Sequence, residues 1–358
     1  MTNRYDESNS DRIITRKSGI SRRAVLRVAG VGLLASMNPW LAGPLIAAED
    51  RYANLQTEKY LGTAEIAATV QHEKIFTEGP VADVEGDIYF TNVPANHILK
   101  YTVKDRTLKV ARENTNAANG LAFYPQGGMK KLLACEGGTD DDGRLTQTDL
   151  NTGEVKVLAD NYQGRALGAP NDLCVDSRGF IYFTSRSVKE TSNVNSVYRM
   201  DRKGALTQIL KTPDIDMPNG VEVSPDDEYL YLVESDGRAG KSRCIRRYEL
   251  QPDGAVKNGM VLTDFSPGRS GDGLCLDSAG NLYIAAGLHK TRGTSETLDT
   301  KPGIHVFTPD GKLVGYAPTP EDTITNCTFG GPDRRTLFVT CGKHLLQIPA
   351  KIGGTAMK

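Results

Sequence analysis

Six positions along the chain combine an oxygen-bearing side chain with the start of an apolar, strand-like segment. In this sequence of 358 residues they stand roughly 40 to 55 residues apart, and they are Glu78, Asn119, Asn171, Asn219, Asp272 and Asn326. Carboxylate and amide oxygens are the ligands that hard cations prefer, and Ca²⁺ takes roughly six to eight of them. If the fold brings the six side chains together, they predict an oxygen-lined divalent-metal site. Ca²⁺ is favoured, and Mg²⁺, Mn²⁺ and Zn²⁺ are the alternatives.

Turn formation is the simpler explanation for any one of these positions. Asn and Asp before glycine are common in turns, because both tolerate left-handed backbone and form local hydrogen bonds. Glu78 does not fit that explanation, since Glu is not a preferred turn residue. All six copies carry an oxygen-bearing side chain, which favours a shared cavity over six unrelated turns.

The elements that would position these side chains are paired strands. Each copy is followed by an apolar strand, a Gly- or Asp-containing turn and a second apolar strand, as in Ile88-Tyr89-Phe90-Thr91. The repeat length matches the roughly 40 to 50 residues of a propeller blade. We therefore predict an all-β chain, a six-bladed β-propeller with a central metal-binding channel, over residues 49–358. Residues 64–70 should close the ring by pairing with residues 344–348, because an open edge strand invites aggregation.

Six short motifs in order resemble the SMP-30/gluconolactonase/luciferin-regenerating-enzyme-like family of six-bladed propeller lactonases. The resemblance runs from about Phe76 to Thr340 and rests on Glu78-Gly79-Pro80, Asn119-Gly120-Leu121, Pro170-Asn171-Asp172-Leu173, Pro218-Asn219-Gly220-Val221, Gly271-Asp272-Gly273-Leu274 and Thr325-Asn326-Cys327-Thr328-Phe329-Gly330-Gly331. It implies that Glu78, Asn219 and Asp272 bind the metal, with Asn171 as a fourth or water-mediated ligand. The residues expected to contact substrate are Asn119, Asn171, Asp172 and Asn326.

The chemistry expected of such a site is hydrolysis of a lactone, an intramolecular ester, to its hydroxy acid. The cation would polarise the carbonyl, and a carboxylate would take the proton of the attacking water. Asp272 is the predicted catalytic base, and Glu78 or Asp172 would replace it if Asp272 is not the base. The substrate class would be a sugar or other small lactone. Two further functions remain open: a non-catalytic, metal-stabilised binding module, and a promiscuous aryl-ester or phosphotriester hydrolase at the same site.

Two segments depart from the family pattern. The family often places an arginine or another polar residue shortly before the Asn-Asp motif and a histidine after the second-blade Glu, whereas this chain has Gly168-Ala169-Pro170 and Cys135-Glu136-Gly137-Gly138. Arg165 or Arg186 could supply the missing charge from a nearby loop. A solvated surface position is the default expectation for both arginines.

The first 48 residues are typical of a twin-arginine export signal. Arg22-Arg23 precedes a short, Gly-rich apolar stretch, and the segment ends in Ile46-Ala47-Ala48. The stretch falls short of the roughly 18 to 20 apolar residues that a membrane span needs. We expect cleavage near Ala48, export by the twin-arginine machinery to the periplasm or beyond, and no stable membrane span in the mature protein.

Composition excludes several other classes of protein. The formal net charge is −1, and no dense Lys/Arg stripe follows residue 50, so we expect no nucleic-acid partner. The six cysteines have irregular spacing without a Cys-x-x-Cys pair, which argues against a cysteine-based zinc or redox centre. Cys174 and Cys275 lie in apolar runs and are expected to be buried thiols, while the pattern leaves disulfide formation open.

Overall fold

The apolar runs of the repeat form strands that are buried on both faces. A computed structural model describes residues 50–125, 130–321 and 323–355, all within the unit Asp50–Lys358. The predicted export signal therefore lies outside the described residues. Every residue of β3 (Ile88–Asn92) and of β21 (Leu282–Ala286) is buried. Such continuous burial is expected where a sheet is covered on both sides by neighbouring sheets.

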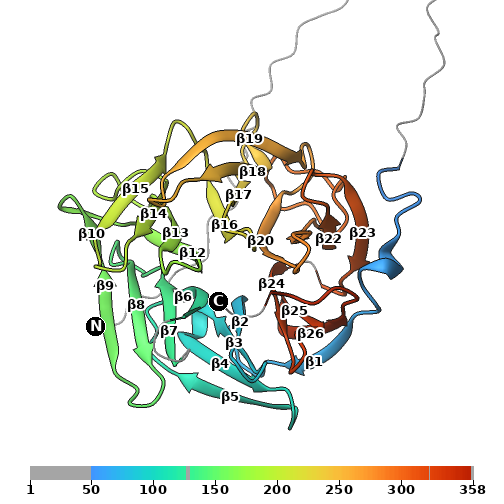
Figure 1. Ribbon diagram of the computed structural model, residues 1–358, viewed down its shortest axis with the longest axis horizontal. Coiled ribbons are helices and arrows are strands. Elements are labelled where there is room, and N and C mark those ends of the chain that lie inside the picture. Colours follow the sequence, from blue (N-terminus) through green and yellow to red (C-terminus); the bar gives the residue numbers. More distant parts are fainter. Residues whose placement is uncertain (1–49, 126–129, 322, 356–358) are drawn as a thin grey trace, which may run out of the picture. The chain divides into compact units, whose positions relative to one another are not determined.

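The described residues form six four-stranded antiparallel sheets, arranged as the blades of a β-propeller in chain order around a central axis (Figure 1). Blades 1 to 3 are β2 (Thr77–Ala82), β3, β4 (His97–Thr102) and β5 (Thr107–Arg112); β6 (Ala118–Tyr124), β7 (Lys131–Glu136), β8 (Arg144–Asp149) and β9 (Val155–Ala159); and β12 (Ala169–Val175), β13 (Ile181–Arg186), β14 (Ser196–Met200) and β15 (Leu206–Lys211). Blades 4 and 5 are β16 (Pro218–Val223), β17 (Tyr229–Ser235), β18 (Arg243–Leu250) and β19 (Val256–Asp264); and β20 (Gly271–Leu276), β21, β22 (Gly303–Phe307) and β23 (Leu313–Pro318).

The sixth blade closes the ring with a strand from the other end of the described chain. It contains β24 (Ile324–Gly330), β25 (Thr336–Cys341), β26 (His344–Pro349) and β1 (Glu65–Thr69). The pairing runs antiparallel from Glu65 opposite Gln347 to Thr69 opposite His344. The predicted closure is thus confirmed, and it joins the two ends of the propeller without a covalent link.

Few regular elements of the described chain lie outside the blades. A short hairpin, β10 (Asn161–Tyr162) with β11 (Arg165–Ala166), precedes blade 3, and the 3-10 helices η1 (Thr57–Lys59) and η2 (Val93–Ala95) have three residues each. Nowhere in residues 50–125, 130–321 and 323–355 is there a helix with the length and apolarity of a membrane span.

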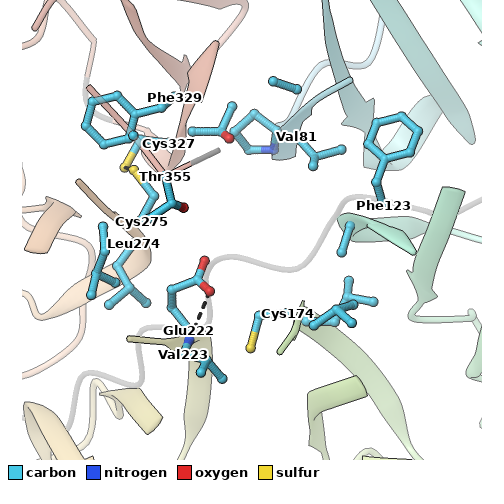
Figure 2. A pocket seen from close by; sticks show the side chains of 18 of the residues that line it. Val81, Phe123, Cys174, Glu222, Val223, Leu274, Cys275, Cys327, Phe329 and Thr355 are labelled. Atoms are coloured by element: carbon cyan, nitrogen blue, oxygen red, sulfur yellow. Dashed lines mark hydrogen bonds between the residues drawn. The ribbon is translucent and has the colours of Figure 1, made fainter. Parts of the chain in front are cut away.

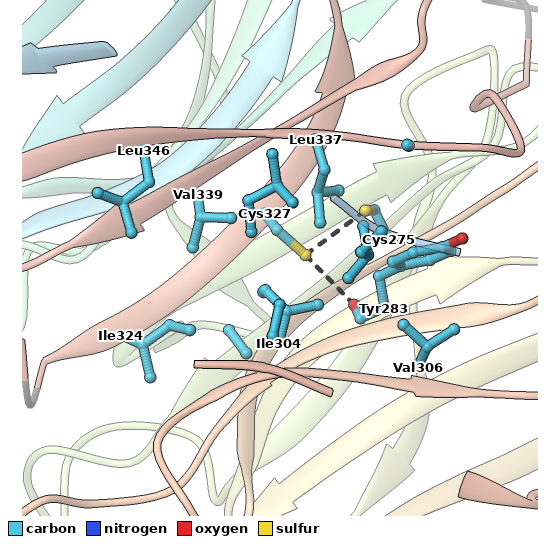
Figure 3. Close-up of a cluster of buried hydrophobic side chains, with 14 of the residues drawn as sticks. Cys275, Tyr283, Ile304, Val306, Ile324, Cys327, Leu337, Val339 and Leu346 are labelled. Atoms are coloured by element: carbon cyan, nitrogen blue, oxygen red, sulfur yellow. Dashed lines mark hydrogen bonds between the residues drawn. The ribbon is translucent and has the colours of Figure 1, made fainter. Parts of the chain in front are cut away.

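The hydrophobic core lies between neighbouring blades. Figure 3 shows the cluster between blades 5 and 6. In it, Tyr283 of β21 packs edge-on against Phe329 of β24, with ring centroids 5.0 Å apart. Cys275 and Cys327 belong to the same cluster, and their sulfur atoms lie 3.5 Å apart. All six cysteines are buried free thiols, as expected for Cys174 and Cys275, and the structure contains no disulfide among them.

Candidate active site

Each of the six predicted positions lies where the innermost strand of a blade departs from regular pairing. The register of β2 against β3 shifts between Glu78 and Val81, and that of β20 against β21 shifts between Gly271 and Leu274. The other four innermost strands shift next to their axial residue: Ala118/Leu121, Pro170/Leu173, Pro218/Val221 and Ile324/Asn326. A bulge turns a side chain away from the sheet face and is common beside active sites. Asn119, Asn171, Asn219 and Asp272 therefore lie inside the irregular stretch of their strands, and Glu78 and Asn326 lie at its edge.

Glycines next to these positions allow the innermost strands to approach one another closely. Gly79 adopts φ of +46°, and a Cβ added to it would lie 2.1 Å from the carbonyl oxygen of Asn119. A Cβ on Gly273 would lie 2.0 Å from Cγ of Asn326. Only glycine fits such contacts, so the Gly that follows a polar residue in the motif has a packing role as well as a turn role.

Threonine hydroxyls connect adjacent blades at the same level. Thr91 donates to the carbonyl of Asn119 at 3.0 Å, and Thr184 donates to the carbonyl of Asn219 at 2.8 Å. Thr325 donates to the carbonyl of Thr77 at 2.8 Å, which links blade 6 to blade 1. These bonds fix the backbone around the axis. This part of the backbone carries seven oxygen-bearing side chains, which we call the axial site: Glu78, Asn119, Asn171, Asp172, Asn219, Asp272 and Asn326.

Asp272 is held by two donors. The Asn219 amide donates a short hydrogen bond to its Oδ1, and the Arg269 guanidinium donates to its Oδ2 at 2.6 Å. Asn219 also donates to the Ser235 hydroxyl at 3.0 Å. Charge-assisted bonds of this kind fix the orientation of a carboxylate. Asp272 is therefore preorganised, and Arg269 is a cation that any metal at this carboxylate must share or displace.

Negative charge is concentrated in the axial site. Burial raises the pKa of Glu78 well above its usual range, and the charges of Asp272 and Asp172 raise it further. Burial also raises the pKa of Asp172 to about 7, although hydrogen bonds from the Leu173 N–H and the Asn326 amide oppose the shift. A cation bound nearby stabilises the charged form of carboxyl groups in such surroundings. The donor set of carboxylate and amide oxygens thus fits a hard divalent ion.

A hydrogen bond crosses the axis between blades 3 and 6. Asn326 in blade 6 donates from Nδ2 to Oδ2 of Asp172 in blade 3, at 3.0 Å. Both residues also line a cavity of about 200 Å³, whose other walls come mainly from the apolar residues that follow the axial positions along the innermost strands. Figure 2 shows Glu222 reaching into this cavity, with Cys174 to one side and Cys275 and Cys327 to the other. Asp172 and Asn326 thus belong both to the axial site and to the lining of this cavity.

The axial site retains free polar groups. Within the part of the chain that the structure describes, the side-chain amides of Asn119 and Asn171 have no hydrogen-bond partner, and Glu78 accepts a bond from the Gly79 N–H at 3.2 Å. No group of three or more His, Cys, Asp or Glu side chains there meets the criteria for a metal cluster. The predicted ligands, two carboxylates and two amides, are a different kind of set, and their role as ligands stays a prediction.

Two arginines belong to the site, and the expectation of a solvated position was wrong for Arg186. Arg186 is partly buried at the end of β13, and burial lowers its pKa while the charges of Asp272 and Glu78 oppose that shift. Arg165 lies outside the site, because it donates to the carbonyl oxygens of Glu190 and Ser192. Arg269 was not predicted from the sequence, although it stands only three residues before Asp272.

The architecture defines a six-bladed propeller with a polar axial site, and comparison with known proteins places it in a family. The model of the SMP-30/gluconolactonase/LRE-like region matches residues 76–343. The chain belongs to this family.

Similar proteins include several lactonases. A gluconolactonase from Zymomonas mobilis is 28% identical over 320 residues, which is 81% of each chain. A 6-deoxy-6-sulfogluconolactonase from Pseudomonas putida is 27% identical over 288 residues, 78% of this chain and 87% of the relative. A solved gluconolactonase from Xanthomonas campestris is 28% identical with a TM-score of 0.66, covering 82% of this chain and 91% of the other.

Proposed function

We propose that this protein is a lactone-hydrolysing carboxylic-ester hydrolase that opens a sugar or other small lactone to its hydroxy acid. The observation that carries the proposal is the preorganised Asp272 beside the buried carboxylate of Glu78, at the axis of a family member. Relatives with lactonase names, at 27–28% identity over about four fifths of the chain, support the reaction class.

The residues that would hold a divalent cation, with Ca²⁺ favoured, are Glu78, Asn171, Asn219 and Asp272. A divalent cation bound there supplies Lewis-acid polarisation of the lactone carbonyl. Asp272 accepts the proton of the attacking water, and its bonds from Asn219 and Arg269 aim the carboxylate. Glu78, whose pKa is raised by burial, would pair with the cation as a carboxylate. The Asn119 amide is free to donate to a lactone hydroxyl or ring oxygen.

The test is hydrolysis of sugar, aliphatic and aromatic lactones by the purified protein, followed by pH-stat titration of the acid formed. Activity should fall on chelation and return with Ca²⁺, with Mg²⁺, Mn²⁺ and Zn²⁺ as comparisons. Chelator-insensitive turnover would refute the metal dependence. No turnover across the whole panel would refute the lactonase and favour a binding module, while aryl-ester or phosphotriester turnover alone would reassign the substrate class.

We further propose that Arg22-Arg23 directs export by the twin-arginine machinery to the periplasm or beyond, with cleavage near Ala48. The supporting observation is the order of the motif, the short apolar stretch and the small residues. Replacing both arginines by lysine should retain the precursor in the cytoplasm in fractionation experiments. Export of that variant at the rate of the natural sequence would contradict the route.

A further inference from the structure

Arg186 presents unused hydrogen-bond donors to the axial site. Its Nε donates to the carbonyl of Pro218 at 3.1 Å, which fixes the position of the side chain. The two terminal nitrogens of the guanidinium have no hydrogen-bond partner within the described residues. Their surroundings include the charges of Asp272, Glu78 and Asp172, none of which makes a hydrogen bond to Arg186. The side chain is therefore held in place with its donor fork free.

The neighbouring arginines have no such freedom. Arg269 uses one terminal nitrogen for the carbonyls of Gly287 and Ile324, at 3.3 and 3.1 Å, and the other for Asp272. Arg165 lies outside the site, where one of its terminal nitrogens donates to two loop carbonyls. Among the three arginines compared, Arg186 alone has both terminal nitrogens without a hydrogen-bond partner in the described residues, and it lies beside Pro218, the residue before Asn219, and opposite Ala169, two residues before Asn171.

A planar guanidinium fork matches a carboxylate, sulfonate or phosphate group, with two parallel hydrogen bonds. Hydroxyl groups of a neutral sugar lactone can be recognised by amides, and Asn119 and Asn171 already offer free amides. The carboxylates of Asp272, Glu78 and Asp172 offset the charge of Arg186, but none of them accepts a hydrogen bond from its two terminal nitrogens, and buried donors without an acceptor are costly. The arrangement thus fits a substrate with a negatively charged substituent better than a neutral one.

We propose that Arg186 is a specificity-determining residue that binds an anionic substituent of the substrate, so that the site is selective for lactones carrying a carboxylate, sulfonate or phosphate group. This inference rests on the proposed lactonase function. The substituent would pair with the Arg186 fork while the lactone ring lies over Asp272, and no bond of the substituent is made or broken.

A matched pair of substrates tests the inference: glucono-1,4-lactone and glucaro-1,4-lactone, which differ by a free carboxylate at C6. The natural protein should have the higher kcat/KM for the glucaro-lactone. Arg186→Gln should reduce that kcat/KM by roughly 10- to 100-fold, mainly through KM, and change the value for the glucono-lactone by less than about 3-fold. Arg186→Lys should restore part of the loss, because the charge returns without the fork.

Two further measurements keep the outcomes distinct. Arg165→Gln is the matched control, since it removes an arginine outside the site, and it should leave the ratio of the two kcat/KM values unchanged. Calorimetric binding of glucaro-1,4-lactone to chelator-treated protein should weaken in Arg186→Gln, which measures recognition without turnover.

Each alternative result has a definite meaning. If neither lactone is hydrolysed and other lactones are also inert, the proposed function fails. If both lactones are hydrolysed and Arg186→Gln lowers both kcat values equally, Arg186 acts on the reacting carbonyl, and the inference is overturned while the lactonase stands. If the variant only relieves inhibition by the product gluconate, Arg186 binds the newly formed carboxylate, and the inference is again overturned.

Discussion

At the scale of single residues, Asp272 is proposed both to bind the cation and to accept the proton of the attacking water. Asp272→Asn keeps an oxygen for a cation but removes the proton acceptor, so kcat should fall by about 10²- to 10⁴-fold while Ca²⁺ still binds measurably. Asp272→Ala should lose both activity and Ca²⁺ affinity, because a charged ligand is removed. Steady-state kinetics at saturating Ca²⁺ and calorimetric Ca²⁺ titration measure the two effects. A natural kcat in Asp272→Asn would make Glu78 or Asp172 the base.

A second residue, His305, should make the stability of the fold sensitive to acid. His305 is fully buried in blade 5, where its Nδ1 lies 3.2 Å from the Gly303 carbonyl and its Nε2 lies 2.9 Å from the Tyr52 hydroxyl. Burial, with a smaller contribution from the charge of Arg51, lowers the pKa of His305 to about 3. Donation from Nδ1 to Gly303 leaves Nε2 to accept from Tyr52, so these contacts suit the neutral ring.

The unfolded chain therefore binds a proton at His305 below a pH of about 6.5, whereas the folded chain does not until the pH approaches 3. Stability from this group should be lost as the pH falls through that window, with a slope of at most about 1.4 kcal/mol per pH unit. His305→Gln should flatten the dependence of the free energy of unfolding on pH, measured by urea denaturation. The same substitution at the exposed His72 is the control, and equal slopes in all three proteins would contradict the prediction.

The oxygen-bearing residues of the axial site could be predicted because each copy of the repeat carries one near the start of its innermost strand. Arg186 and Arg269 have no counterparts in the other copies, so the repeat gives no signal for them. Arg269 pairs with the site because it stands three residues before Asp272, next to the strand that carries it. A cation close in sequence to a predicted catalytic carboxylate is the signal that could have found it. The contact of Arg186 depends on the path of β13, which residue spacing does not reveal.

At the scale of elements, the close approach of innermost strands can be tested with two glycines. Gly79 and Gly153 both have positive φ, +46° and +76°. A Cβ at Gly79 would overlap the Asn119 carbonyl, whereas a Cβ at Gly153 meets no atom within 4 Å. Gly153→Ala should cost only the backbone strain, about 1 to 2 kcal/mol.

Gly79→Ala should cost at least about 3 kcal/mol, because overpacking between blades 1 and 2 adds to the same strain. Chemical denaturation of the two variants measures the difference. If both lost the same stability, the contact between β2 and β6 would be loose enough to absorb a methyl group. The strands themselves were predictable from their apolar runs, but the register shifts that aim the axial residues were not, because a bulge adds no distinctive residue to the pattern.

At the scale of the whole molecule, the six blades form a ring that is closed around a central axis. The ring is closed by the pairing of β1 with β26 and by hydrogen bonds between blades 6 and 1, such as that from Thr325 to the Thr77 carbonyl. The strand pairing was predictable because an odd strand at one end matched an incomplete blade at the other. The number of blades followed from the number of motifs. The hydrogen bond across the axis could not be predicted in this way. It joins Asp172 and Asn326, which are 154 positions apart, and it depends on the ring being closed.

The position of the axial site predicts a link between metal binding and global stability. The proposed ligands Glu78, Asn171, Asn219 and Asp272 come from blades 1, 3, 4 and 5, so one cation would join four blades and relieve the repulsion between buried carboxylates. A ligand that binds only the folded chain stabilises it by about 2.7 kcal/mol at a free concentration 100 times its Kd. The melting temperature should therefore rise with Ca²⁺ and fall on chelation, as measured by differential scanning calorimetry. Asp272→Ala, which removes a ligand from the axis, should abolish the Ca²⁺-dependent shift, whereas Asp140→Ala, which removes an exposed carboxylate on a loop, should retain it. A melting temperature that is independent of Ca²⁺ and chelator in the natural protein would contradict a structural link, because four blades cannot share a bound ion without being stabilised by it.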